Sequence, residues 1–195
     1  MNLTANIKVS IRLMSGGHSF SPETLNSAVE RCGEKLTVEL VTPKTTLVPA
    51  SVFRAEDAPS YLAALGLAAD VNESVVCSPQ IGDVVAVMAI SAECLAYLSL
   101  LCGDKMSFVT PLLLGYAPKE GAVVELHGEV LYVRIFNGGM LFSEVMDASS
   151  DVDIVYYLQQ IHQVYNLYNM RVRARGDVER IKMLCKGLFT QLECE

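Results

Sequence analysis

The feature that most constrains this fold is a change of hydrophobic period, which occurs several times within the second half of the chain. Three runs with strand period come first, at residues 122–126, 130–136 and 140–146. Residues 137–139 read Asn-Gly-Gly and accept positive φ, so they predict a hairpin turn. Ser150 and Asp153 resemble a capping box and predict a helix over 151–166, with Leu158, Ile161, Tyr165 and Tyr168 on one stripe.

The rest of the second half predicts one more strand and one more helix. Residues 170–175 alternate in the manner of a strand, and Asp177 then caps a helix whose apolar stripe runs to Leu192. The order is therefore three strands, a helix, a strand and a helix. A fifth strand beside the fourth is not predicted, so we expect the fourth strand to lie at an edge of the sheet.

The first half predicts a similar order. Strands are expected at residues 7–14, 18–21 and 36–42, with a turn between the first two and an extended loop over 43–49. A helix is expected over 57–67 and another over 91–103, on either side of a strand at 83–90. That strand is apolar throughout, which is typical of a strand covered on both faces. Residues 106–109 predict one more strand.

Each half therefore predicts a three-strand, helix, strand, helix unit with a mixed sheet, and the chain predicts a duplicated α/β architecture. The segment over 115–121 breaks the pattern with Gly115, Pro118 and Gly121. We place the domain boundary there, with one domain over residues 1–118 and the other over 119–195.

Charge and hydropathy limit the partners and the compartment. The chain carries 22 acidic and 15 basic residues and a net charge of −7, whereas nucleic-acid binders generally show a basic excess. The first residues lack a secretory pattern, and the longest uncharged stretch, 106–118, is too short to span a bilayer. We expect a cytoplasmic protein with no membrane insertion and no nucleic-acid partner.

Metal and disulfide chemistry finds little support in the positions of the cysteines and histidines. The six cysteines are scattered and form no C-x-x-C pair, and the three histidines are equally dispersed. The sequence predicts reduced thiols that pack as small hydrophobes. We expect no metal site and no cofactor.

Several strings in this order carry a resemblance to a known family. They are Ser10 to Leu13, Ser19 to Ser21, Leu47 to Pro49, Val52 with Phe53, and Asp153 to Leu158. Together they resemble a bacterial family called domain of unknown function 3822. The resemblance implies an actin-like ATPase fold of two ribonuclease-H-like lobes, similar to the pilus-assembly protein PilM. It implies no activity.

An actin-like ATPase needs an acid at the end of a first strand to hold Mg²⁺, glycine-rich hairpins for phosphate, and a Gly-Gly turn for adenosine. The strand over 7–14 has no acid, although Ser15, Gly16 and Gly17 form a suitable turn. The second half offers Glu125, followed by His127 and Gly128. Gly176 takes the adenosine position, but Asp177 follows where a second glycine is expected, and an acid there repels phosphate.

Glu125 and His127 also permit a different interpretation. Residues i and i+2 lie on one face of a strand, so the two side chains can form an acid–base pair. The sequence shows no nucleophile or third member beside them. The alternative is a histidine that ends a strand in an ordinary turn.

Two further groups of residues predict interaction surfaces. The helix over 151–166 is rich in tyrosine, and Tyr156 and Tyr157 suit a protein interface because tyrosine combines apolar area with a polar tip. Arg171, Arg173 and Arg175 alternate along a strand and share one face, which suits an anion or acidic partner. The alternative for the arginines is an exposed face of the sheet, or an edge strand protected by charge.

These observations favour a non-catalytic actin-like scaffold or protein-binding module, which binds another protein or itself. The alternative is a nucleotide-binding actin-like ATPase with its ligand in the cleft between the lobes. A small-molecule sensor that uses the same cleft is a third interpretation.

Overall fold

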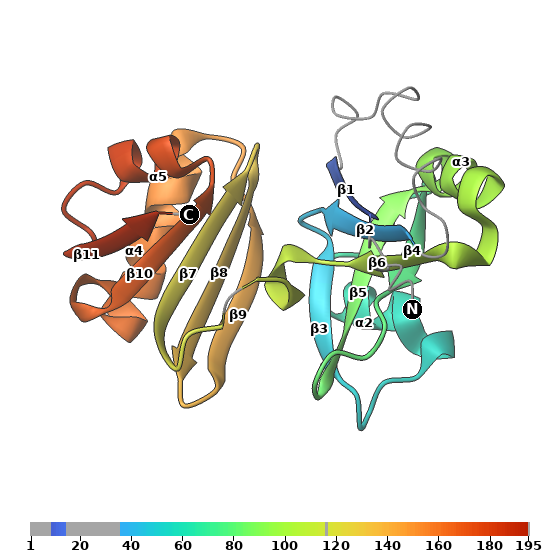
Figure 1. Cartoon of the computed structure of the whole chain (residues 1–195), viewed down its shortest axis with the longest axis horizontal. Coiled ribbons are helices and arrows are strands. Elements are labelled where there is room, and N and C mark those ends of the chain that lie inside the picture. The colour runs from blue at the N-terminus through green and yellow to red at the C-terminus, as the bar shows by residue number, and fades with distance from the viewer. Residues whose placement is uncertain (1–8, 15–35, 116, 195) are drawn as a thin grey trace, which may run out of the picture. The chain divides into compact units, whose positions relative to one another are not determined.

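The computed structural model describes residues 9–14, 36–115 and 117–194, which form a mixed α/β structure (Figure 1). The chain divides into two compact units, Met1–Leu113 and Leu114–Glu195, and each is described by itself below. The boundary expected between residues 118 and 119 stays a prediction. The strand expected at residues 18–21 lies outside the described residues. Within the described part, no helix is both long and apolar enough to span a bilayer.

The first unit contains two three-stranded sheets among its described residues. In one sheet β1 (Val9–Met14), β2 (Leu36–Val41) and β6 (Met106–Val109) run parallel, with β2 in the middle. In the other, β5 (Val84–Ser91) lies between β3 (Thr45–Pro49) and β4 (Glu73–Cys77) and is antiparallel to both. Among the described residues of this unit, the helices are α2 (Ala58–Ala64), α3 (Ala92–Cys102) and the short 3₁₀ turns η1 (Ala55–Asp57), η2 (Gly103–Lys105) and η3 (Pro111–Leu113).

Strand β5, in the middle of the antiparallel sheet, is covered on both faces, as its continuous apolar sequence predicts. Ala86, Met88 and Ile90 join one buried cluster, whereas Val87 and Ala89 join another. Alternate residues of a strand point to opposite faces, so β5 contributes to both cores. The predicted cap of α3 is also confirmed, because the Ser91 hydroxyl accepts a hydrogen bond from the Cys94 amide at 3.4 Å.

One prediction for the first unit is wrong, and one strand was missed. The segment over 43–49 is not a loop throughout: β3 pairs with β5, and its proline, Pro49, belongs to an edge strand, where a missing N–H is tolerated. The strand β4 was not predicted, because its five residues include Glu73 and Ser74 and show no clear alternation. The described part of this unit therefore departs from the three-strand, helix, strand, helix order.

The second unit is built on one five-stranded sheet in the order β11-β10-β7-β8-β9. The strands are β7 (Glu120–His127), β8 (Val130–Asn137), β9 (Met140–Asp147), β10 (Arg171–Gly176) and β11 (Gln191–Cys194). The first three form an antiparallel meander, and β10 and β11 run parallel to β7. The hairpin predicted over 137–139 is confirmed, with the Asn137 amide bonded to the Gly139 carbonyl at 2.9 Å.

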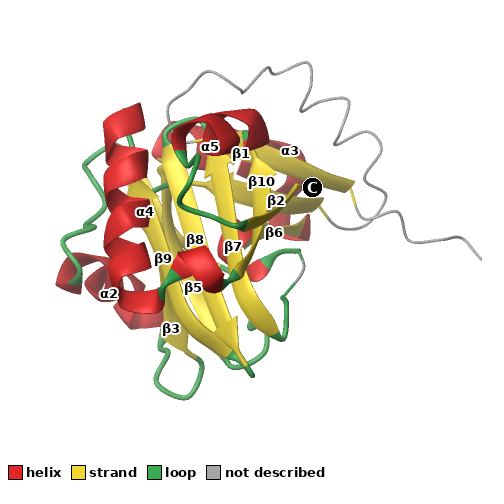
Figure 2. Cartoon of the chain, turned by 90° about the vertical axis from the view of Figure 1, so that its left-hand side faces the viewer, coloured by secondary structure: helices red, strands yellow, loops and turns green. Residues whose placement is uncertain are grey.

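Both α-helices of the second unit, α4 (Asp151–Tyr165) and α5 (Val178–Leu184), cover one face of this sheet, as Figure 2 shows. Leu158 and Ile161 of α4 and Ile181 of α5 pack there against Val124, Leu126 and other apolar residues of the strands. The capping box of Ser150 and Asp153 is confirmed in both directions. Tyr165 is half-buried against Phe142, but Tyr168 lies beyond α4 in η4 (Leu167–Asn169) and is exposed, so its predicted place on the core stripe is wrong.

The last predicted helix is too long, and this changes the sheet. Helix α5 ends at Leu184, and Gly187 follows with φ +90°, a backbone conformation that does not continue a helix. Leu192 then pairs with Val172 as part of β11. The unit therefore has the fifth strand that the sequence did not predict, and β10 lies between β7 and β11 rather than at an edge.

Candidate functional site

The candidate site lies on the sheet face of the second unit that α4 and α5 do not cover. Ala122, Val124 and Leu126 of β7 belong to the apolar core beneath the helices. Because side chains alternate along a strand, Glu125 and His127 point to the opposite face. Both are buried, with 2% of Glu125 and 7% of His127 exposed. Burial of ionisable groups is costly unless they are paired, so their partners decide what this site can do.

Glu125 and His127 form the pair that their i, i+2 spacing predicts. Their atoms Oε1 and Nε2 are 2.6 Å apart. Because a carboxylate only accepts hydrogen bonds, Nε2 carries the proton and donates it to Glu125. The His127 ring also meets the ring of Tyr132 edge to face, with 6.4 Å between centroids. His127 is the last residue of β7 rather than a turn residue, and this keeps its ring over the sheet.

Arg175 supplies the second partner of Glu125. Strand β10 runs parallel to β7 with Arg175 directly opposite Glu125, and Arg175 Nη1 donates to Glu125 Oε2 at 3.1 Å. Burial raises the pKa of Glu125, but the hydrogen bond with His127 and the positive charges of Arg175 and Arg134 outweigh it and hold the pKa below its ordinary value. Glu125 is therefore ionised at neutral pH, with each carboxylate oxygen engaged.

Gly128 lies in the turn between β7 and β8, beside the paired acid. Its carbonyl accepts a hydrogen bond from Arg180 Nη1 at 3.0 Å. Arg180 of α5 also forms an ion pair with Asp151 at the start of α4, at 2.7 Å. The guanidinium of Arg180 therefore links the turn at Gly128 to both helices, and this contact stabilises the turn.

Gly176 and Asp177 also have structural roles that account for their identities. A β-carbon on Gly176 would overlap the carbonyl oxygen of Leu126, and the residue has φ +74°, so only glycine fits without strain. The Asp177 amide donates to the same carbonyl at 2.8 Å, and its side chain accepts from the Arg180 amide at 3.2 Å. Asp177 is thus the predicted cap of α5.

The other two arginines of β10 lie on the same face as Arg175, as their alternation predicts. Arg171 and Arg173 both pair with Glu193 of β11, at 3.3 and 3.0 Å. The interpretation of these arginines as protection for an edge strand is wrong, because β11 covers that side of β10. The missed strand β11 is also what brings Glu193 to them.

The two tyrosines proposed for an interface differ in exposure. Tyr156 is 55% exposed, whereas Tyr157 is half-buried and packs against the apolar core. Val152 and Val164 are also exposed on α4, four residues before Tyr156 and eight after it. We call these three residues the outer face of α4. The valines were not predicted, although the four-residue spacing from Val152 to Tyr156 is a usable signal.

The structure thus brings one group of predicted residues together and leaves others elsewhere. Glu125, His127, Gly128, Arg175, Gly176 and Asp177 gather where β7 and β10 end. Arg171 and Arg173 lie nearer the start of β10, and the tyrosines lie on α4. Ser15, Gly16 and Gly17 lie outside the described residues. Sequence reasoning missed Arg180, whose signal is its position three residues after the helix cap.

Chemically, the cluster around Glu125 is an ionic group in which the carboxylate contacts both His127 and Arg175. The carboxylate carries one negative charge, and the guanidinium of Arg175 lies against one of its oxygens. Mg²⁺ binds carboxylate oxygens directly or through water, and an adjacent guanidinium competes for the same oxygens. The arrangement orients His127 and fixes its protonated nitrogen.

Comparisons with known proteins bear on the fold. No protein-family model matches the chain, and no curated protein matches it. A Bacteroides thetaiotaomicron protein with an actin-like ATPase fold and unknown function is similar in structure, with a TM-score of 0.65 and 14% identity over 91% of this chain and 77% of that one.

A second solved structure is the cytoplasmic domain of EpsL, an inner membrane component of the type II secretion system of Vibrio cholerae. It has a TM-score of 0.49 and 15% identity over 95% of this chain and 88% of that chain. The conclusion about the fold of this chain rests on its structural similarity to the Bacteroides protein. The chain described here has an actin-like ATPase fold.

Proposed function

We propose that this chain is a non-catalytic protein of the actin-like fold that acts by binding another protein. The observation that carries the proposal is the engagement of both carboxylate oxygens of Glu125, one by His127 and one by Arg175. In the resemblance drawn above, Glu125 takes the position of the acid that holds Mg²⁺ in the second lobe. Here its charge serves the folded structure instead.

The roles of Gly176 and Asp177 support the same proposal. Each residue is explained by contacts within the second unit, Gly176 by its closeness to the Leu126 carbonyl and Asp177 by its cap of α5. A nucleotide would need the Asp177 position to accept a phosphate or a ribose, and a carboxylate repels the first. Neither residue requires a ligand to account for it.

The proposal also includes membership of the family called domain of unknown function 3822, similarity to PilM, a bacterial origin and a cytoplasmic location. It includes, further, that the chain consists of two related ribonuclease-H-like lobes. The strand order β9-β8-β7-β10-β11 supports a ribonuclease-H-like second unit. The first unit has a different arrangement in its described residues, so a duplication would require divergence of its sheets.

The outer face of α4 is the proposed binding surface. Val152, Tyr156 and Val164 are 75%, 55% and 73% exposed. Exposed apolar side chains can become buried when a partner binds, and tyrosine is enriched at protein interfaces. The opposite side of α4 is already packed on the sheet through Leu158 and Ile161. The helix is therefore anchored on one side and offers apolar area on the other.

The binding proposal is tested by comparing variants of the tagged full chain in cells of its native source. We expect the double variant Tyr156→Asp, Val164→Asp to lose partners that the wild type retains, because each charge would have to be desolvated at the interface. The control is Leu100→Asp, which changes an exposed apolar residue of α3 in the first unit. Identical sets of partners for all three proteins would contradict the role of this face.

The rival function, nucleotide binding, is tested by thermal unfolding with ATP or ADP, each with and without Mg²⁺. Ligands that bind the native state raise its stability by about 2.7 kcal/mol at a hundred times their dissociation constant. We expect no magnesium-dependent rise in Tm. A rise that disappears in Glu125→Gln would overturn the non-catalytic proposal, since it would assign the metal to that carboxylate.

A further inference from the structure

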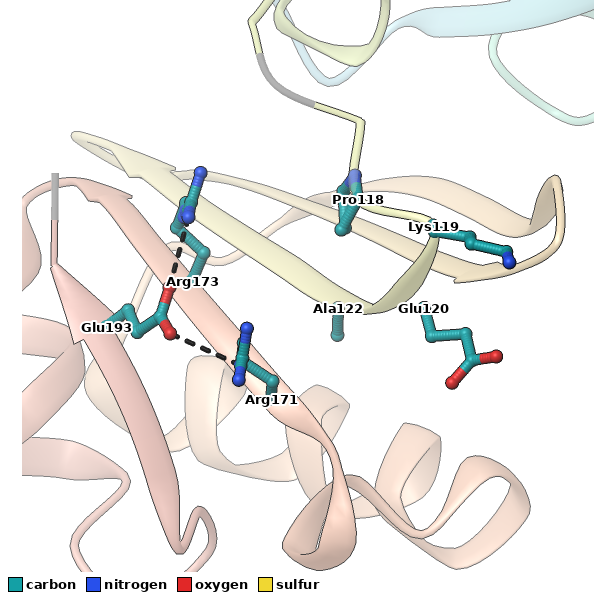
Figure 3. A pocket seen from close by; sticks show the side chains of 7 residues that line it. All are labelled: Pro118, Lys119, Glu120, Ala122, Arg171, Arg173 and Glu193. Atoms are coloured by element: carbon teal, nitrogen blue, oxygen red, sulfur yellow. Dashed lines mark hydrogen bonds and ion pairs between the residues drawn. The ribbon is translucent and has the colours of Figure 1, made fainter.

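A pocket on the second unit gathers more cationic than anionic side chains. It has a volume of about 290 Å³ and is bounded by the starts of β7 and β10 and by β11 (Figure 3). Lys119, Arg171 and Arg173 line it together with the carboxylates of Glu120 and Glu193. Three cations against two anions contrast with the net charge of −7 of the whole chain. We call it the basic pocket.

The arginines of the basic pocket share one carboxylate. Arg171 Nε and Arg173 Nη2 each contact Glu193, at 3.3 and 3.0 Å, and Figure 3 shows the two guanidinium groups on either side of it. The guanidinium of Arg171 has five N–H donors, and its contact with Glu193 uses the one on Nε. Arg171 is 67% exposed and Glu193 44% exposed, so a ligand in the pocket can reach both. Guanidinium groups bind the oxygens of carboxylates and phosphates in a planar, two-point geometry.

A second, larger pocket adjoins the first, and its lining combines apolar side chains with the polar ones of Asn137, Asn169 and Gln191. It has a volume of about 610 Å³ and shares Glu120 and Arg171 with the basic pocket. Its apolar lining comes from Ile135, Phe136, Leu141 and Met170, close to the bulge in β8 and the link into β10. We call it the apolar pocket. Volumes of this order are typical of pockets that hold small organic ligands.

We propose that the two adjoining pockets form one site for a small amphipathic organic anion. The anionic head lies against Arg171 in the basic pocket, and the apolar body extends over Phe136, Leu141 and Met170 in the apolar pocket. Arg171 and Glu120 line both pockets, and Arg171 supplies the positive charge at the place where head and body join. Charge assistance from the guanidinium gives the head its affinity, and burial of the apolar body adds to it.

The site is separate from the cluster around Glu125 and from the outer face of α4. Arg171 and Glu125 belong to different parts of the sheet, since Arg175 is the residue opposite Glu125. The proposal therefore stands or falls independently of the proposed function. A small ligand there would add a sensing or carrying role to a protein that binds partners elsewhere.

Octanoate is a suitable probe at concentrations below those at which it forms micelles. Acetate is the control that has the anionic head without the apolar body, and octanol is the control that has the apolar body without the anionic head. Binding is followed by NMR on the full chain, through the methyl signals of Ile135, Leu141 and Met170. We expect octanoate to shift these signals with an affinity at least about tenfold higher than that of acetate or octanol, because only octanoate uses both pockets.

Variants locate the two halves of the site. Arg171→Gln should weaken octanoate binding about tenfold and leave octanol unaffected, whereas Leu141→Ser should weaken both. The matched control is Arg54→Gln, which removes the same charge from an exposed arginine of the first unit. The amide spectrum of each variant shows whether it folds. If Arg171→Gln does not fold, Leu141→Ser still tests the apolar pocket, and the comparison of octanoate with octanol tests the basic pocket.

Three results would overturn the proposal. The first is equal affinity for octanoate and octanol, which would leave no role for the basic pocket. The second is octanoate binding that Arg171→Gln and Arg54→Gln weaken equally, which would indicate general charge attraction. The third is octanoate shifts confined to methyl groups outside the apolar pocket.

Discussion

The two faces of the sheet in the second unit use the same strands for opposite purposes. Alternate residues of β7 place Val124 and Leu126 under the helices, and Glu125 and His127 on the other side. The covered face is held by apolar packing, which depends on volume and tolerates similar residues. The other face contains buried charges, each of which depends on a specific partner. The comparison shows that one strand can tolerate similar apolar residues on one face and require particular charged residues on the other.

The largest effect is expected on the covered face. Leu158→Ala should lower the free energy of unfolding by about 2–5 kcal/mol, because it removes a fully buried side chain of α4 and leaves a cavity. Urea denaturation measures the loss. Val152→Ala on the exposed side of the same helix should change it by less than about 0.5 kcal/mol. Similar losses for both variants would mean that α4 does not pack as described.

A somewhat smaller effect is expected where the two faces end at Gly176. Gly176→Ala should cost more stability than Gly138→Ala, although both residues have positive φ, because only Gly176 lies against a backbone carbonyl. The backbone strain alone costs about 1–2 kcal/mol. Thermal unfolding of the two variants separates the overlap from the strain. Equal Tm values would show that Gly176 is not required by its contact with Leu126.

On the charged face, the pair of Glu125 and Arg175 should show energetic coupling. Glu125→Gln should lower the free energy of unfolding by about 1–3 kcal/mol, since it removes the negative charge that Arg175 Nη1 contacts. Adding Arg175→Gln should restore part of the loss, and a double-mutant cycle measures the coupling. Strictly additive losses would show that the two charges do not stabilise each other.

The smallest effect is a dependence on pH. The pKa of Glu125 lies below its ordinary value of 4.5 in the folded chain, so its contribution is fully present above about pH 5 and decreases as the pH falls through the folded pKa. The stability difference between wild type and Glu125→Gln should therefore be constant near pH 7 and should diminish in acid. A difference that grows on acidification would indicate a raised pKa instead.

Local patterns predicted most elements of the second unit, because its strands alternate and its helices have caps. They failed for β11, whose few residues continue the stripe of α5 by chance and become a strand through pairing with β10. They failed likewise for β3 and β4, where pairing with β5 decides the structure. Short segments take their conformation from distant partners, and sequence periodicity does not contain that information.

The same limit applies to the candidate site. The i, i+2 spacing predicts the contact between Glu125 and His127 because it lies within one strand. Arg175 is 50 residues away, and its pairing with Glu125 requires the register of two parallel strands. Strand β10 carries arginines and strand β7 carries an acid. These opposite charges in two strands of one unit could have indicated an ion pair, but each strand was considered alone.

The most direct test of the account asks whether Glu125 binds a divalent cation or serves Arg175 and His127. NMR of the Glu125 side-chain carboxyl carbon can be recorded with ATP while paramagnetic Mn²⁺ replaces Mg²⁺. The account predicts that the signal keeps its linewidth at Mn²⁺ concentrations that also leave the exposed Glu129 unaffected. Selective broadening of the Glu125 signal would place the metal at this carboxylate and contradict the account.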